Sequence, residues 1–281
     1  MSSTRLTRGP RVLVFDSGLG GLTVFERIAE ARPDAALVYV ADDAAFPYGA
    51  LGERDVVTRV TAVMENLIAR HAPDLVVIAC STASTLVLGP LRERYPTLPF
   101  VGTVPAIKPA AAASKSRLVS VLATPGTVAR DYTQALVREH AGDCDVTLVG
   151  SARLAALAER FIRGLPIDHE EIAQEIAPCF IEKQGRRTDL VVLACTHYPL
   201  LSEHLVQLAP WPVDYVDPAP AIARRVDTLL GPAGGPTLVD AHAPAYFTSG
   251  LEPEAALRAA LLKFGLFVAP TDADAFQFGR P

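Results

Sequence analysis

The sequence predicts an α/β fold: two doubly wound parallel-sheet domains related by pseudo-two-fold symmetry, with the active site in the cleft between them. Short apolar runs alternate with amphipathic helical segments, as they do when parallel strands are joined by helices. Two of these runs, residues 74–79 and 189–194, are nearly identical, and a cysteine follows each, Cys80 or Cys195. Ligands of such sheets bind beyond the carboxyl ends of the strands, so both thiols are expected to face one cleft.

The first half is expected to alternate strands and helices from residue 11 onward. Strands are predicted at residues 11–15, 36–40, 74–79 and 100–101, and helices at about 22–31, 53–71 and 83–94. A turn with an aromatic residue at its tip, Phe46-Pro47-Tyr48-Gly49, separates the second strand from the helix that follows it.

The first strand runs into a glycine-rich turn, Asp16-Ser17-Gly18-Leu19-Gly20-Gly21. This turn lacks both the Gly-x-x-x-x-Gly-Lys pattern of a phosphate-binding loop and the dinucleotide-binding fingerprint. The sequence fits better a turn that lets Asp16 and Ser17 approach a small ligand, with backbone N–H groups at the helix start.

The pattern restarts near residue 104. Strands are predicted at residues 117–122, 145–149, 189–194 and 212–216. One helix is predicted to start after a turn at 123–127 and to run to about residue 140, and a second to span 151–163 with Ser151 as its cap. Three more are predicted at about 168–183, after the last of these strands up to residue 230, and near 253–264. The C-terminal segment is expected to return to the first domain. The predicted domains are therefore residues 1–103 plus 214–281, which hold Cys80, and residues 104–213, which hold Cys195.

The composition is that of an ordinary globular protein, and 281 residues are enough for two domains. The net charge is −5 and no basic block or stripe occurs, so neither nucleic acid nor an acidic membrane is an expected partner. No apolar stretch of a signal peptide follows the N-terminal segment 1–10, and no run reaches the ~20 apolar residues of a membrane-spanning helix. A cytoplasmic location is expected.

The four cysteines have neither the close spacing of a zinc site nor that of a redox Cys-x-x-Cys pair. In a reducing compartment, disulfides are not expected. Cys144 and Cys179 are interpreted as small hydrophobic residues of the core, whereas the strand-end positions of Cys80 and Cys195 favour a chemical role. No pattern indicates a requirement for a metal, pyridoxal phosphate or a nucleotide.

Six segments together resemble the glutamate racemase family of the aspartate/glutamate racemase superfamily. They are FDSGLGGLTV at 15–24, PYG at 47–49, ACSTAS at 79–84, GTVPAIKPA at 102–110, LAT-x-GTV at 122–128 and ACTHYPLL at 194–201. The resemblance covers almost the whole chain and is weakest after about residue 235. Two matching cysteine motifs at the family's separation make it specific.

The resemblance implies cofactor-independent inversion of glutamate at Cα, supplying D-glutamate for peptidoglycan, in a homodimer. In the family one cysteine removes the α-proton as a thiolate, and the other reprotonates the opposite face as a thiol. On this pattern Cys80 acts on D-glutamate and Cys195 on L-glutamate. Asp16, Glu159 and His197 match residues that assist proton transfer. The implied substrate contacts are Asp16, Ser17, Tyr48, Gly49, Ser81, Thr82, Thr196 and His197.

The chemistry of inversion favours the same two thiols. One base could invert a stereocentre only if the base or the substrate moved, whereas a base on each face serves both directions. A free thiol has a pKa near ~8.5, which a helix N-terminus or a nearby cation lowers. Both cysteines are expected just before a helix start, whose N–H donors can also hold the substrate's α-carboxylate.

Ser81 departs from the family pattern, in which Asn usually follows the first cysteine. Serine keeps a hydroxyl, but its side chain is shorter than that of asparagine and has one donor fewer. This difference bears on substrate affinity more than on reaction type.

Three alternatives stay open: racemisation of aspartate or another acidic amino acid, a binding protein of the same fold without turnover, and a cysteine hydrolase. The segments 47–49 and 194–201 argue against the first, and two symmetric thiols are redundant for the single nucleophile of the last.

Overall fold

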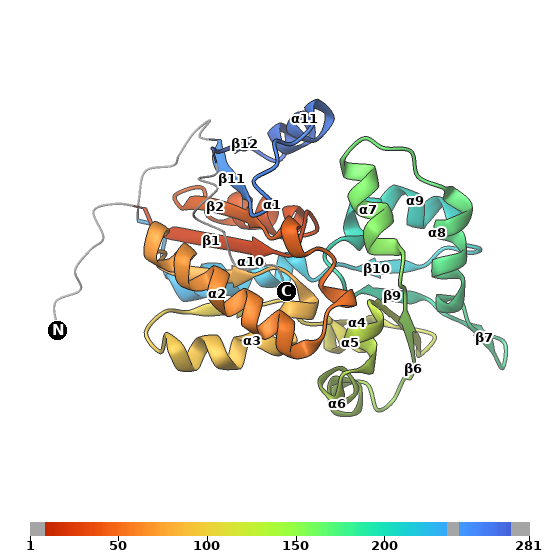
Figure 1. The fold of residues 1–281 in the computed structure, drawn as a ribbon. Helices are drawn as coiled ribbons and strands as arrows, with labels where there is room; N and C mark the ends of the chain where they lie inside the picture. Colours follow the sequence, from red (N-terminus) through yellow and green to blue (C-terminus); the bar gives the residue numbers. More distant parts are fainter. Residues whose placement is uncertain (1–8, 235–241, 271–281) are drawn as a thin grey trace.

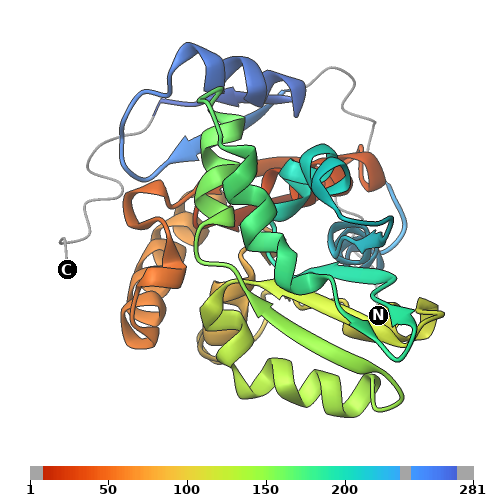
Figure 2. The ribbon, with the colours of Figure 1, turned by 90° about the vertical axis from the view of Figure 1, so that its right-hand side faces the viewer.

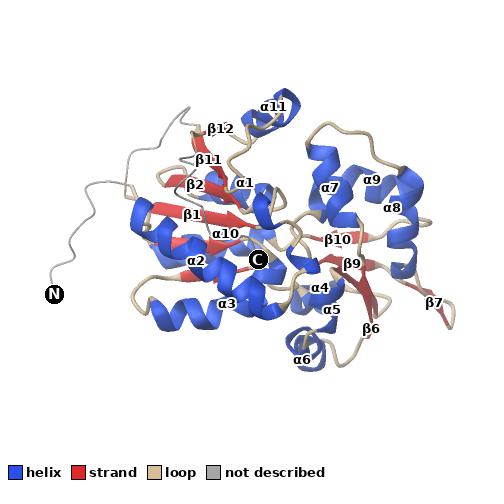
Figure 3. Ribbon diagram, in the orientation of Figure 1, coloured by secondary structure: helices blue, strands red, loops and turns tan. Residues whose placement is uncertain are grey.

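A computed structural model describes residues 9–234 and 242–270 of the chain. Within these residues the strands form a six-stranded sheet, a four-stranded sheet and a two-stranded hairpin, and helices cover both faces of the two larger sheets (Figures 1 and 3). The predicted α/β class with two parallel sheets is confirmed. The N-terminal segment 1–8, where no signal peptide is predicted, lies outside the described residues.

The first sheet is parallel throughout. Its strands, in spatial order, are β12 (Leu266–Val268), β11 (Ala243–Phe247), β2 (Ala36–Ala41), β1 (Arg11–Asp16), β3 (Leu75–Ile78) and β4 (Phe100–Gly102). One face packs on α1 (Leu22–Ala31), α10 (Ala219–Leu230) and α11 (Ala255–Lys263), and the other on α2 (Glu53–His71) and α3 (Ser81–Arg94).

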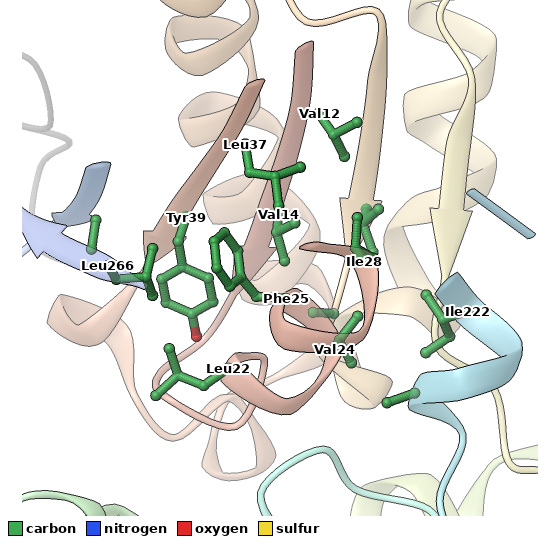
Figure 4. Close-up of a cluster of buried hydrophobic side chains, with 14 of the residues drawn as sticks. Val12, Val14, Leu22, Val24, Phe25, Ile28, Leu37, Tyr39, Ile222 and Leu266 are labelled. Atoms are coloured by element: carbon green, nitrogen blue, oxygen red, sulfur yellow. The ribbon is translucent and has the colours of Figure 1, made fainter. Parts of the chain in front are cut away.

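Strand β1 shows why its apolar run is unbroken. Successive side chains point to opposite faces, so Val12 and Val14 pack with α1 while Leu13 and Phe15 pack with α2. Figure 4 shows Val12 and Val14 among the side chains of the first of these clusters. Fully burying one such side chain contributes about 1.5–3 kcal/mol, so a polar residue on either face of β1 would destabilise the sheet.

The second sheet repeats this arrangement with four parallel strands. In spatial order they are β10 (Asp214–Val216), β9 (Leu190–Leu193), β5 (Leu118–Ala123) and β6 (Asp145–Gly150). One face packs on α7 (Leu154–Ile162), α8 (His169–Ile176) and α9 (Ser202–Leu208), and the other on α4 (Ile107–Ala113) and α6 (Asp131–His140). A short helix, α5 (Pro125–Ala129), follows β5.

Two predicted helices of the second half are wrong in their extent. The helix expected at 168–183 ends at Ile176, and a single 3₁₀ turn containing Pro178 leads to the hairpin β7 (Glu182–Lys183) and β8 (Arg186–Arg187). Both residues between these strands, Gln184 and Gly185, have positive φ, as in a type I′ hairpin turn. The helix expected up to residue 140 is broken at Arg130 into α5 and α6.

The C-terminal segment joins the first sheet, as expected, but it also contributes two strands that the sequence did not indicate. Strand β11 pairs with β2, and β12 pairs with β11. The strand β10, which the predicted boundary at 214 assigns to the first domain, instead pairs with β9. The chain thus passes to the first sheet after Val216. In Figure 2 the C-terminal segment (blue) stands beside the end of α7 (green), where a Cβ on Gly164 would lie 3.0 Å from Ala256.

Among the described residues, no helix combines the length and the apolarity needed to cross a membrane.

Candidate active site

A pocket lies where the carboxyl ends of the two sheets meet. Cys80 follows β3, Cys195 follows β9, and both line it together with residues from each half. Of the residues predicted from the sequence, nine line the pocket: Ser17, Tyr48, Gly49, Cys80, Ser81, Thr82, Cys195, Thr196 and His197. The other two, Asp16 and Glu159, are buried next to lining residues.

Cys80 is a buried thiol that precedes the first turn of α3. The Ser17 hydroxyl donates to its Sγ at 3.4 Å. Burial, and then the negative charge of Asp16, raise the pKa of Cys80 to about 12, although the Ser17 hydrogen bond opposes this shift. At neutral pH this cysteine therefore holds its proton.

The Asp16 carboxylate, at the end of β1, is fully buried. Its Oδ2 accepts from the backbone N–H groups of Gly18 at 3.2 Å and Gly21 at 3.0 Å. Its Oδ1 is buried without a hydrogen-bond partner among the described residues. A buried carboxylate oxygen left in this way is an acceptor for a ligand that brings its own donor.

Cys195 has a different neighbour, the imidazole of His197. Nδ1 of His197 lies 3.9 Å from Sγ of Cys195, and Nε2 lies 3.0 Å from Oε1 of Glu159 on α7. Burial lowers the pKa of His197, but the contacts with Cys195 and Glu159 outweigh it and raise that pKa well above its ordinary value. Burial likewise opposes ionisation of Glu159, yet its contact with His197 leaves the pKa of Glu159 lowered. The raised pKa favours the protonated form of the imidazole beside Cys195.

The segment after Cys195 does not begin with the regular helix that was expected. A short 3₁₀ helix spans Tyr198–Leu201, and α9 starts only at Ser202. The two cysteines therefore differ in their helix environment: a 14-residue helix begins directly after Cys80, whereas a four-residue turn follows Cys195 at a distance of two residues.

The glycine-rich turn after β1 allows the two halves to approach closely. A Cβ on Gly20 would lie 2.3 Å from Nδ1 of His197, and a Cβ on Gly18 would lie 2.3 Å from Oε1 of Glu159. Neither glycine has positive φ, so steric room and not backbone freedom requires them. Leu19 N–H also donates to Glu159 Oε1 at 2.5 Å. The turn thus holds the His197–Glu159 pair, besides placing Asp16 and Ser17.

Four lining residues were not singled out as site residues from the sequence: Phe46, Pro47, Thr124 and Ala155. Thr124 follows β5, and its Oγ1 lies 3.3 Å from Oγ1 of Thr82 across the two halves. The ring of Phe46 lies 5.4 Å from that of His197. The position of Thr124 after a strand of the second sheet is the signal that could have identified it.

Ser81 lies directly after Cys80. It is buried in the first turn of α3, lines the pocket, and its Oγ has no hydrogen-bond partner among the described residues. The other two cysteines lie in the hydrophobic clusters of the second half, Cys179 fully buried and Cys144 partly buried.

Two cysteines line one pocket from two parallel sheets, which places an acid/base group on each side of a bound molecule. The sequence profile of the Asp/Glu/hydantoin racemase family matches residues 16–226, and the chain belongs to this family.

Curated relatives make the match more specific. The glutamate racemase of Brucella anthropi is 53% identical over 258 residues, which are 92% of this chain and 93% of the relative. That of Sinorhizobium fredii is 52% identical over 92% of this chain and 96% of the relative. The resemblance seen in the six sequence segments is thereby confirmed.

A solved structure agrees with this assignment. The Escherichia coli glutamate racemase, crystallised with L-glutamate and the activator UDP-MurNAc-Ala, superposes with a TM-score of 0.83 at 39% identity, over 92% of this chain and 97% of that one. The Francisella tularensis enzyme in complex with D-glutamate, 20% identical with a TM-score of 0.72, has the same fold.

Proposed function

We propose that this protein is a glutamate racemase in which Cys80 and Cys195 act on opposite faces of Cα. The observation that carries the proposal is that the two cysteines follow corresponding strands of two parallel sheets and line a single pocket. The relatives at 52–53% identity over most of the chain support glutamate as the substrate.

In the direction from L- to D-glutamate, Cys195 as thiolate takes the α-proton, so the Cα–H bond breaks and the electron pair stays on Cα. The thiol of Cys80 then gives its proton to the opposite face of Cα, which leaves Cys80 as the thiolate. A protonated His197 beside Cys195 would stabilise a negative charge on that sulfur, and the raised pKa of Cys80 favours its starting proton. The reverse direction runs through the same steps backwards.

The carbanion needs its negative charge stabilised, and the pocket supplies donors for the α-carboxylate. We assign the substrate contacts to Asp16, Ser17, Tyr48, Gly49, Ser81, Thr82, Thr196 and His197. Among these, Ser81 and Thr82 stand in the first turn of α3, where N–H groups and the helix dipole favour an anion. The unpaired Oδ1 of Asp16 suits the substrate ammonium group. All of these steps use side chains of the protein, so we expect no cofactor.

Incubation with L-glutamate in D2O tests the proposal. Racemisation in D2O replaces the α-hydrogen by deuterium, so the Hα signal in the proton NMR spectrum and the circular dichroism of glutamate are expected to decay together. A protein that only binds glutamate leaves both signals unchanged, and that outcome would refute the proposal. L-Aspartate in a parallel sample decides between glutamate and a broader acidic substrate range.

We further propose that the product D-glutamate serves peptidoglycan synthesis, that the enzyme acts in the cytoplasm, and that it is a homodimer. Growth of a D-glutamate-requiring bacterial strain without added D-glutamate, when it expresses this protein, tests the first point. Sedimentation at several concentrations tests the last one.

A further inference from the structure

The carboxylate of Asp42 lies behind one wall of the pocket. Asp42 directly follows β2 and is fully buried, and its backbone N–H donates to the carbonyl oxygen of Asp16 at 2.8 Å. The hydroxyl of Tyr48, a residue that lines the pocket, donates to Oδ2 of Asp42 at 2.5 Å. Asp42 itself does not line the pocket.

Two further side chains hold this carboxylate from separate parts of the chain. Arg59 of α2 makes a two-point contact, from Nη2 to Oδ1 at 2.6 Å and from Nε to Oδ2 at 3.0 Å. Thr248, which follows β11, donates its hydroxyl to Oδ1 at 2.5 Å. A carboxylate that accepts from an arginine fork and two hydroxyl groups has a fixed orientation.

The same contacts fix the side chain of Tyr48. A phenol has one proton to donate, and that proton goes to Asp42. Burial, followed by the charge of Asp42, raises the pKa of Tyr48 well above its ordinary value, so the phenol keeps this proton. The Tyr48 side chain and the adjacent Gly49 are therefore held in one position at the wall of the pocket.

We propose that Asp42 is a positioning residue of the substrate pocket, which acts through the hydroxyl of Tyr48 and is held in place by Arg59 and Thr248. The inference rests on the proposed racemase function, because it assigns the wall at Tyr48 and Gly49 to glutamate binding. Thr248 thereby links the C-terminal segment to substrate affinity although it does not line the pocket.

The test uses Thr248→Val, which at nearly constant shape removes one donor to Asp42 and also the acceptor of the Ala44 N–H (3.3 Å). A matched control is Ser249→Ala, which removes the donor of the next residue to the neighbouring carboxylate, Asp43 (Oγ to Oδ2, 2.6 Å). We expect Thr248→Val to raise KM about three-fold and Tyr48→Phe about ten-fold, with kcat within two-fold, because a wall that holds the substrate throughout acts on binding. Ser249→Ala should leave both constants unchanged.

A double variant decides whether the effect passes through Tyr48. If it does, Thr248→Val adds nothing to KM once Tyr48→Phe has removed the hydroxyl. An undiminished effect in the double variant, or equal KM values for Thr248→Val and Ser249→Ala, would overturn the inference. Partial unfolding would instead lower kcat at unchanged KM, and thermal melting detects it. The calorimetric Kd of glutamate gives the same comparison without turnover, so this inference and the racemase activity can fail separately.

Discussion

The two sides of the pocket correspond in topology and differ in electrostatics. Cys80 follows β3, the neighbour of the interior strand β1, and Cys195 follows β9, the neighbour of the interior strand β5. On the first side, burial and the Asp16 carboxylate keep the thiol protonated. On the second side, a histidine with a raised pKa stands 3.9 Å from the sulfur.

This difference shows that corresponding positions in two halves need not have corresponding electrostatic surroundings. The pocket at rest combines a thiol that keeps its proton on one side with a sulfur beside a histidine of raised pKa on the other. Such a pair is ready to accept a proton from one enantiomer and to give one to the product.

Replacing either cysteine with alanine should abolish racemisation, by about 10²–10⁴-fold or more, because each face loses its acid or base. The comparison adds a finer expectation for exchange in D2O. Cys80→Ala should still place deuterium into L-glutamate through Cys195, and Cys195→Ala should do so only with D-glutamate. Mass spectrometry of the recovered enantiomers measures this. Exchange into both enantiomers by one variant would contradict the two-sided arrangement.

Glu159→Gln should lower kcat by about 10–100-fold, since it removes a charged hydrogen-bond partner of His197. Arg163→Gln is the matched control, because Arg163 contacts Oε2 of Glu159 at 3.2 Å, whereas His197 contacts Oε1. The loss of Arg163 should change kcat less than three-fold. Equal losses in both variants would mean that the charge beside Cys195 does not matter for turnover.

The same pair gives a pH dependence of stability. The pKa of Glu159 is lowered from 4.5, so its contribution is present above pH 4.5 and is lost as pH falls through the folded value. The pKa of His197 is raised well above 6.5, so its contribution is present below pH 6.5 and is lost as pH rises through the folded value. Urea denaturation should therefore show the largest wild-type advantage over Glu159→Gln between these two pH values. An advantage that is constant with pH would exclude a charged pair.

The kinetic constants of the two enantiomers should differ as well. D-Glutamate needs Cys80 as the thiolate, which is its minor form. The apparent affinity for D-glutamate is therefore reduced in proportion to the fraction of Cys80 that is ionised. Because the enantiomers have equal free energy, kcat/KM must be equal in both directions. Both KM and kcat are therefore expected to be larger for D-glutamate than for L-glutamate, by the same factor. Asp16→Asn should reduce this ratio, and a smaller KM for D-glutamate than for L-glutamate would reverse the assignment.

The smallest effect is expected at Ser81, whose buried hydroxyl has no protein partner among the described residues. Ser81→Asn adds an amide donor, and a hydrogen bond to a charged group is worth about 1.5–3 kcal/mol, of which a bound water can already supply part. KM for glutamate should fall a few-fold with little change in kcat. A folded but inactive variant would show that the pocket fits serine alone.

The positions of both thiols could be predicted from the sequence because each depends on a local pattern. An unbroken apolar run predicts a buried parallel strand, and the end of that run predicts which residue lies at the edge of the sheet. His197 and Glu159 were assigned only by resemblance, since their contact joins α7 to the turn after Cys195. The position of Thr124 after a strand marks it as a candidate, but its contact with Thr82 depends on how the two sheets face each other, which no local pattern shows.

The errors in secondary structure also have physical causes. Strand β11 contains Pro244, which cannot donate to a ladder and argues against an interior strand, and β12 is only three residues long. The amphipathic pattern of the helix predicted at 168–183 continues past Pro178, but the helix ends at Ile176, two residues before this proline. The helix stops just before Pro178, whereas Pro244 does not prevent an interior strand, so the effect of each proline depends on its neighbours in space.

The contact between Thr248 and Asp42 joins residues 206 positions apart. During synthesis both cysteines and their strands leave the ribosome well before Thr248 does. A nascent chain can therefore contain the complete pair of thiols while the support of Tyr48 is still unfinished. Full substrate affinity then depends on the chain being made through residue 248, so early termination or clipping in the last strands would weaken glutamate binding before it disturbed the thiols.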